Sequence, residues 1–218
     1  FWLKSKCRDR SGRHAMQPIT CRTAFFVVVA VQFASAAGCD VEDDGLALHI
    51  GNCDTNAVAS MLQQLHLWNH AEQLTLELQY NGLGDARLQL LTDPLSKFAN
   101  LTALDLDLYG NLLHSEGASL LGRALMQLDN LNTLVLHLGG NHLGDHGLHE
   151  LVNALCSLKL SVLSLHAADC GLTALPAWTE LGPGCLKTLK TLDLDVASNG
   201  LRVVPAVGVI GSCELPSL

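Results

Sequence analysis

The sequence has few aromatic side chains and no motif of a common enzyme class. Phenylalanine, tryptophan and tyrosine make up 5% of its 218 residues, although 49% of the residues are hydrophobic. A core with so few rings has to be mostly aliphatic, which favours a repeated architecture over a mixed globular one. The chain also has no phosphate-binding loop, no Cys-x-x-Cys pair and no Gly-x-Ser-x-Gly turn. We therefore expect a non-enzymatic protein without a cofactor.

Evidence for a metal site is weak. His149 and Glu150 resemble the start of a zinc-protease helix, but Asn153 occupies the place of the second histidine ligand. His142, His146 and His149 have a spacing that metal ligands can adopt. A solvated surface explains these histidines equally, because His142 precedes the expected helix and need not share its face. We expect no metal.

No apolar stretch is long enough to span a bilayer comfortably, since a spanning helix needs roughly 20 apolar residues. Residues 1–15 are basic without an apolar period, and we expect a disordered or non-native leader there. Residues 16–37 have the order of a secretory signal peptide: Arg22, an apolar run over 24–34, then small residues at 35–37. The alternatives are an uncleaved membrane anchor, a lipid on Cys39 and a buried core helix.

Positive charge is scarce beyond residue 37. Six of the 13 lysine and arginine residues lie within 1–37, which leaves seven against 20 aspartate and glutamate residues and a net charge of −13. Phosphate backbones would repel so acidic a chain, so we expect no nucleic-acid partner. We expect membrane contact only through an uncleaved signal or a lipid anchor. The sequence indicates no oligomeric state.

Leucine, in contrast, is abundant and regularly spaced. The pattern LxxLxLxLxxNxL recurs at intervals of 28 to 30 residues, starting at Asp43, Ala71, Leu101, Leu131, Leu160 and Leu189. Leucine fills the fourth and sixth positions of every copy. Because alternate residues of an extended segment share one face, each copy predicts a strand with an inward apolar side.

The eleventh position carries a side chain that can bond a turn. Its occupants are Cys53, Asn81, Asn111, Asn141, Cys170 and Asn199. An asparagine amide bonds neighbouring backbone groups, so stacked copies would form a structural ladder of these side chains. Apolar residues at helical spacing follow, for example Leu148, Leu151, Val152 and Leu155.

This repeat resembles the leucine-rich-repeat family, and its length is similar to that of the ribonuclease-inhibitor-like class. The resemblance covers residues 43–203. It implies an α/β fold: a right-handed solenoid, or horseshoe, with a parallel concave sheet and a mainly helical convex side, formed by residues 38–218 in about six coils. Pro176 and Pro205 disfavour regular helices, so we expect an irregular outer side in the last two coils.

Six cysteines remain beyond residue 37, an even number that suits an oxidising compartment. Cys53 and Cys170 occupy the ladder position, where we expect buried free thiols. Cys156 and Cys185 share position 26 of the repeat, and Cys213 is at position 25. One disulfide among these three is possible, but core packing explains their position equally. Cys39 could clip the first coil.

Residues between the inward leucines would form the concave face, where solenoids usually bind partners. At the seventh position every copy has a histidine or a carboxylate: His49, Glu77, Asp107, His137, His166 and Asp195. The fifth position adds Asp105 and Asp193. Parallel strands lie about 4.8 Å apart, so Asp107, His137, His166 and Asp195 would form a continuous row with mutually dependent charges. A solvated face without a ligand and a metal site are the alternatives.

The family resemblance implies a recognition module that binds a protein through its concave face. A membrane-tethered receptor or adhesion ectodomain, and an intracellular enzyme regulator of the ribonuclease-inhibitor type, remain open. The apolar leader favours a secreted or extracellular protein, with membrane anchoring as the alternative. Asn100 begins the sequence's one glycosylation signal, Asn-Leu-Thr.

Overall fold

A computed structural model describes residues 40–43, 47–51, 57–175 and 187–201 of the chain. The expected leader (1–15) and signal peptide (16–37) lie outside these residues, as do Cys39, Cys53, Cys185 and Cys213. Within the described part, no helix combines the length and apolar character needed to cross a membrane.

The described strands form one seven-stranded sheet in which neighbours in sequence are neighbours in space. β2 to β7 are mutually parallel, and β1 (Asp40–Asp43) pairs with β2 in the antiparallel sense. The parallel strands are β2 (Ala47–Gly51), β3 (Gln73–Glu77), β4 (Ala103–Asp107), β5 (Thr133–His137), β6 (Val162–His166) and β7 (Thr191–Asp195).

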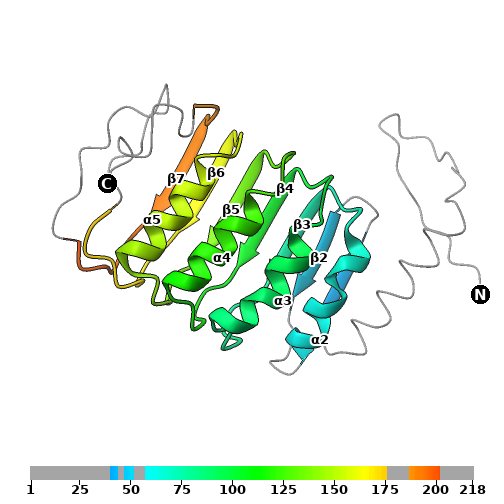
Figure 1. Cartoon of the computed structure of the whole chain (residues 1–218), viewed down its shortest axis with the longest axis horizontal. Helices are drawn as coiled ribbons and strands as arrows, with labels where there is room; N and C mark the ends of the chain where they lie inside the picture. The colour runs from blue at the N-terminus through cyan, green and yellow to red at the C-terminus, as the bar shows by residue number, and fades with distance from the viewer. Residues whose placement is uncertain (1–39, 44–46, 52–56, 176–186, 202–218) are drawn as a thin grey trace, which may run out of the picture.

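Helices cover one side of the sheet and leave the other side open (Figure 1). They are α2 (Ala57–Gln64), the 3₁₀ helix η1 (Leu65–Trp68), α3 (Asp85–Leu95), α4 (Ser115–Leu125) and α5 (Gly144–Leu155). The chain thus alternates strand and helix in an α/β fold compatible with a leucine-rich-repeat-like solenoid. After β6 no helix is present as far as Leu175; the rest of the expected irregular outer side, including Pro176 and Pro205, lies outside the described residues.

The core lies between the two layers and is built mainly from leucine. In β3, Leu74 and Leu76 are 1% and 0% exposed, and Leu78 just after the strand is 0% exposed. Burying one such side chain contributes about 1.5–3 kcal/mol, so repetition stabilises the array coil by coil. The close approach of α4 to α5 depends on Gly122, because a Cβ there would lie 2.8 Å from the Cβ of Ala154.

The strand register confirms the repeat from the second coil onward. Leu74, Leu104, Leu134, Leu163 and Leu192, all at the fourth position, are successive partners across β3 to β7. The seventh-position residues from Glu77 to Asp195 are likewise paired strand to strand. Every side chain predicted to point inward in these strands therefore does so.

The expected register of the first coil is wrong by two residues. Leu48 pairs with Leu74 and His49 with Thr75, so His49 aligns with the fifth position rather than with Glu77 at the seventh. Asp43, expected to open the first coil, ends the antiparallel strand β1 instead. A shift of two residues keeps the same side chains on each face of a strand, so the apolar alternation cannot distinguish the two registers.

Three asparagines of the eleventh position, Asn111, Asn141 and Asn199, bond the coil before them as well as their own. Asn141 is 0% exposed; its Nδ2 donates to the carbonyls of Leu108 and Leu138 at 2.9 and 2.8 Å, and its Oδ1 accepts from Leu113 N at 3.0 Å. Asn111 and Asn199 repeat this arrangement. These bonds satisfy backbone groups that the turn would otherwise leave unpaired.

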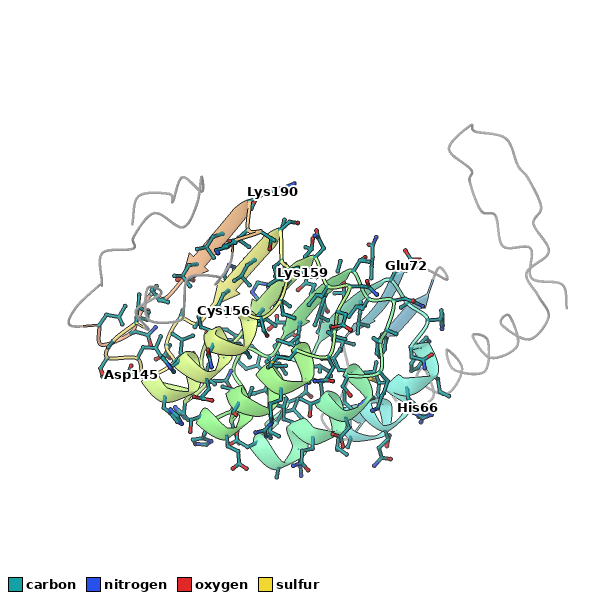
Figure 2. All side chains as sticks on the ribbon, turned by 45° about the horizontal axis from the view of Figure 1, so that its top comes forward. His66, Glu72, Asp145, Cys156, Lys159 and Lys190 are labelled. Carbon is teal, nitrogen blue, oxygen red and sulfur yellow. The ribbon has the colours of Figure 1, made fainter. Side chains whose placement is uncertain are left out.

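The two described cysteines differ in state. Cys170 is a buried free thiol in the ladder; it donates to the Leu138 carbonyl at 3.1 Å, and burial raises its pKa to about 11. Cys156, at the end of α5 (Figure 2), is disulfide-bonded, and its partner lies outside the described residues. The thiol of Cys170 is therefore structural rather than reactive.

Candidate functional site

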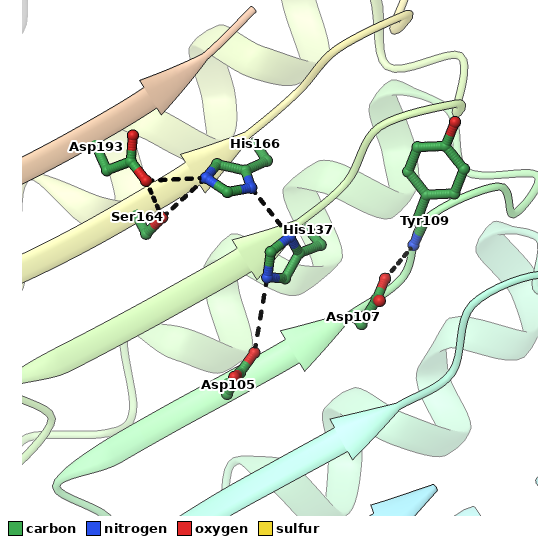
Figure 3. A network of polar contacts seen from close by, with 7 residues as sticks. All are labelled: Asp105, Asp107, Tyr109, His137, Ser164, His166 and Asp193. Atoms are coloured by element: carbon green, nitrogen blue, oxygen red, sulfur yellow. Dashed lines mark hydrogen bonds and ion pairs between the residues drawn. The ribbon is translucent and has the colours of Figure 1, made fainter. Parts of the chain in front are cut away.

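The candidate site is the open face of the sheet, formed by the side chains that alternate with the buried leucines. In β4, β5 and β6 these outward residues are half-buried, whereas the inward ones are fully buried. Five polar residues of β4 to β7 meet in one network of contacts (Figure 3): Asp105, His137, Ser164, His166 and Asp193.

Two histidines lie at the centre of this network. His137 and His166 are register partners on β5 and β6, and their Nδ1 atoms are 3.0 Å apart. The rings meet edge to face, with centroids 4.6 Å apart. Because only one hydrogen can lie between two nitrogens at this distance, at most one of the two Nδ1 atoms is protonated in this arrangement.

Ser164 and Asp193 hold the far side of His166. The Nε2 of His166 is 3.1 Å from Asp193 Oδ2 and 3.0 Å from Ser164 Oγ, and the serine hydroxyl also donates to Asp193 Oδ2 at 3.0 Å. The hydrogen bond from His166, followed by that from Ser164, lowers the pKa of Asp193. Asp193 therefore stays ionised and favours the His166 tautomer that carries its hydrogen on Nε2.

Asp105 faces the far side of His137, with its Oδ1 4.0 Å from His137 Nε2. If His166 donates from Nε2, its Nδ1 has to accept from His137, which leaves His137 Nε2 without a hydrogen. One added proton at that nitrogen would face the Asp105 carboxylate. A second added proton would require a hydrogen on both Nδ1 atoms, and the two hydrogens would push the rings apart. The two outer nitrogens of the pair, His137 Nε2 and His166 Nε2, thus each face a carboxylate.

The flanking carboxylates are not those predicted from the sequence. Asp107 and Asp195 are register partners of the two histidines, but their side chains turn away. Asp107 Oδ1 accepts from Tyr109 N, and Asp195 Oδ1 accepts from Ala197 N, both at 2.9 Å. An aspartate readily bonds the backbone two residues onward, and this local contact wins at a strand end. The fifth-position residues Asp105 and Asp193 contact the histidines instead.

The other predicted residues lie apart from this network. Glu77 is on β3, beside Asp107. His49 is on β2, opposite Thr75. Asn100 is exposed in the turn that leads into β4, where a glycan could be attached. Among the residues that the structure describes, no group of three or more histidine, cysteine or acidic residues could hold a metal ion.

Two tyrosines that sequence reasoning missed lie where β3 and β4 end. Tyr80 is 70% exposed and Tyr109 40%, and their rings meet edge to face with centroids 5.4 Å apart. Tyr80 has φ +57°, a left-handed conformation that costs a non-glycine residue about 1–2 kcal/mol. The equivalent residues of the next two coils are glycines, Gly110 and Gly140, also with positive φ. The sequence did contain a signal for Tyr80: it stands directly before the ladder asparagine Asn81, where the next two coils have glycine.

Each tyrosine ring lies across a glycine of the following coil. A Cβ on Gly110 would meet the Tyr80 ring at 2.5 Å, and one on Gly139 would meet the Tyr109 ring at 2.9 Å. Desolvation, Tyr109 and the negative charge of Asp107 raise the pKa of Tyr80. The Tyr80 hydroxyl therefore remains neutral at physiological pH.

Charge is segregated between the sheet and the rest of the described structure. The five segments that comprise strands β3 to β7 and the turns after them (73–83, 103–113, 133–143, 162–172 and 191–201) contain no lysine or arginine. Their acidic residues are Glu77, Asp105, Asp107, Asp169, Asp193 and Asp195. The described cations lie in the helical layer or lead into strands, as Lys159 and Lys190 do in Figure 2.

A comparison with protein-family models finds no matching family, and a comparison with curated proteins finds no match. Among solved structures, the chain is similar to leiomodin-1 actin-binding site 2, with 21% identity and a TM-score of 0.41 over 52% of this chain. That match spans 64% of the leiomodin structure, less than two thirds of it. The chain is also similar to the leucine-rich-repeat ectodomain of the receptor kinase SOBIR1 from Arabidopsis thaliana, with 14% identity, a TM-score of 0.35, and 80% and 92% of the two chains covered. At these TM-scores, neither likeness indicates a partner.

Proposed function

We propose that this protein is a non-enzymatic recognition module that binds a protein partner through the open face of its sheet. The observation that carries the proposal is the ordered polar network of Asp105, His137, Ser164, His166 and Asp193 on an otherwise regular face. A parallel sheet usually has both faces covered. Here the described helices cover only one, and the polar residues of the other are already arranged by the strands.

The finer class of the fold belongs to the same proposal. We infer a right-handed horseshoe of the ribonuclease-inhibitor-like class, with the open face on its concave side. Helices of 11 and 12 residues after β3, β4 and β5 support this class. In that geometry the network would lie on the inner surface, where a partner can contact several coils at once.

The Ser164, His166 and Asp193 contact does not favour an enzyme. In a serine–histidine–aspartate triad, the serine and the aspartate bond opposite nitrogens of the imidazole. Here both bond His166 Nε2, and the serine hydroxyl donates to the carboxylate. Ser164 also lies inside β6, whose backbone pairs with β5 and β7, so the backbone N–H groups of this strand point along the sheet toward its neighbours rather than toward the open face. We expect Ser164→Ala to leave hydrolysis of p-nitrophenyl acetate at the wild-type background.

Protonation of the histidine pair should regulate this surface. Histidine is the side chain that ordinarily changes charge between about pH 5 and 8. Besides each other, the pair faces Asp105 from β4 and Asp193 from β7, while the side chains of Asp107 and Asp195 bond their own turns. Uptake of one proton would cancel one negative charge at the centre of the face. A cationic partner would then bind more weakly in acid.

A secreted or extracellular location fits the proposal. The disulfide at Cys156 supports an oxidising compartment, because such bonds are rare in the cytosol. This argues against an intracellular enzyme regulator. Whether the protein is released or membrane-anchored depends on the segment at 16–37. Attachment of a glycan at the exposed Asn100 would agree with export.

The test is capture of proteins from extracellular material by the immobilised chain. Asp105→Asn with Asp193→Asn neutralises two carboxylates on the open face. Glu116→Gln with Glu150→Gln neutralises two on α4 and α5 and serves as the matched control. A partner retained by wild type and control but lost from the open-face variant supports the proposal. Equal retention by all three proteins would place the binding surface elsewhere.

A further inference from the structure

The exit edge of the sheet, where the strands end, combines acidic charge with exposed aromatic rings. Asp107 is the last residue of β4, and Tyr109 follows it by two residues, with its backbone N–H bonded to that carboxylate. Tyr80 lies against Tyr109, and the Asp107 charge acts on its hydroxyl. Two rings and a carboxylate therefore form one cluster at the turns after β3 and β4.

Tyr80 is an unfavourable residue for its position. Its left-handed backbone recurs at the equivalent place of the next coils, where Gly110, Gly140, Asp169 and Ser198 stand; among these five residues only Tyr80 has a large side chain, and that side chain is largely exposed. A strained residue is retained where the surrounding structure determines it, and such residues cluster at functional sites. Exposure argues against a core role, because an exposed ring contributes little to packing. A glycine at this position would remove the exposed ring that lies beside Tyr109.

We propose that Tyr80 and Tyr109 anchor an arginine side chain from a basic segment of the protein partner. This inference rests on the proposed function and names the chemistry of that partner. A guanidinium stacks on a tyrosine face while its N–H groups bond a carboxylate, which Asp107 offers alongside. Tyrosine is also enriched among the residues that dominate binding energy at interfaces.

Charge complementarity selects a basic occupant. The strands and exit turns from β3 to β7 contain six acidic residues and neither lysine nor arginine, while the described cations lie elsewhere. An acidic segment would be repelled along the whole face. Lysine would satisfy the charge, but its compact ammonium cannot stack and bond the carboxylate in the same way as the planar guanidinium. The cluster therefore distinguishes arginine from lysine.

The experiment measures binding of oligo-arginine and oligo-lysine peptides of equal length to the full chain by fluorescence anisotropy. The variants are Tyr80→Gly, Tyr109→Ala and the double substitution Tyr80→Phe with Tyr109→Phe. Met126→Ala, which removes a similarly exposed apolar side chain just after α4, is the control. Because glycine adopts φ +57° without strain, Tyr80→Gly should unfold at the same or a higher urea concentration than wild type.

We expect the arginine peptide to bind more tightly than the lysine peptide. Tyr80→Gly and Tyr109→Ala should each weaken arginine-peptide binding about tenfold, with little change for lysine. The double phenylalanine variant and Met126→Ala should bind like wild type. Equal affinity for the two peptides, or unchanged binding by both tyrosine variants, would overturn the inference. Loss of a dimer in those variants, seen by sedimentation, would assign the cluster to a second copy of the chain and also overturn it.

Substitution of the carboxylates separates this inference from the proposed function. If Asp105→Asn with Asp193→Asn weakens peptide binding but the tyrosine variants do not, the open face binds and only the aromatic anchor is wrong. If neither set has an effect, the peptides do not bind this face and the arginine anchor is wrong, whereas the proposed function is decided by the capture experiment.

Discussion

Removal of the Asn141 side chain tests the ladder at its most buried member. In Asn141→Ala, the Leu113 N–H loses its only described acceptor, Asn141 Oδ1. The three carbonyls that Asn141 serves keep other donors: Leu108 O retains Asn111 Nδ2 at 2.9 Å, Leu138 O retains the Cys170 thiol at 3.1 Å, and Gly139 O, a weaker acceptor of Asn141, retains Gly110 N at 2.9 Å. The cost is therefore dominated by one buried unpaired donor, which is worth about 1–3 kcal/mol.

With the bonds to these carbonyls also lost, we expect Asn141→Ala to lower the free energy of unfolding by about 2–3 kcal/mol. The assay is urea unfolding followed by circular dichroism. His142→Ala is the neighbouring control: its ring is exposed and its backbone bond to Leu113 O remains, so the change should stay within about 0.5 kcal/mol.

Asn141→Asp sharpens the test because it keeps the acceptor and changes only the donor. A carboxylate in place of the amide would turn an oxygen toward the carbonyls of Leu108 and Leu138. At neutral pH, it should be less stable than Asn141→Ala, and the difference should shrink in acid as the carboxylate is protonated. Equal midpoints for the alanine variants at 141 and 142, or an aspartate variant more stable than alanine at neutral pH, would refute the hydrogen-bond account.

Further expectations concern pH, the turns and export. Binding of a cationic partner should weaken from about pH 8 to 5, and His137→Gln with His166→Gln should remove most of that dependence, whereas His142→Gln should not. Hydrogen bonds from Thr173 and Ala174 lower the pKa of Asp145 below its ordinary 3.8; the stability it contributes is present above that value and lost as pH falls through the folded-state pKa. Urea melts of Asp145→Asn should therefore depend less on pH below about 4 than those of wild type. Gly110→Ala, at φ +63° and under the Tyr80 ring, should lower the free energy of unfolding by about 1–2 kcal/mol in urea melts and shift the tyrosine near-ultraviolet circular dichroism. A chain started at Met16 should be exported with a mature end near Gly38, and N-terminal sequencing that finds the intact leader in the cytosol would contradict this.

The periodic features of the sequence predict the periodic part of the fold. The leucines at positions four and six align strand by strand from β3 to β7, because each coil repeats the same spacing. The first coil could not be predicted in the same way. A two-residue shift preserves the apolar alternation of β2, and the sequence of β1 does not contain the repeat pattern. Irregular structure after β6 was expected from Pro176, although most of that segment lies outside the described residues.

The candidate site shows how far strand register alone reaches. It places His137 beside His166, because seventh positions are partners across parallel strands. The register does not determine where a side chain points. The prediction from register therefore placed Asp107 and Asp195 beside the histidines, whereas both bond their own turns. Ser164 and the two tyrosines were missed for a related reason. Their roles depend on contacts between coils, and the residue types within one repeat do not reveal such contacts.

The hydrogen bonds by which Asn111, Asn141 and Asn199 join neighbouring coils all reach back to the coil before. Asn111 bonds Asn81 N and Leu83 N in the coil before it, and Asn199 bonds Cys170 N and Leu172 N in the same sense. The turn that ends one coil is thus completed by a side chain synthesised about a whole repeat later. As the protein emerges from the ribosome, its newest coil always lacks the residue that closes its turn. Assembly should therefore trail synthesis by one coil, and a premature stop should damage the coil before the break more than a missing leading coil damages the one after it.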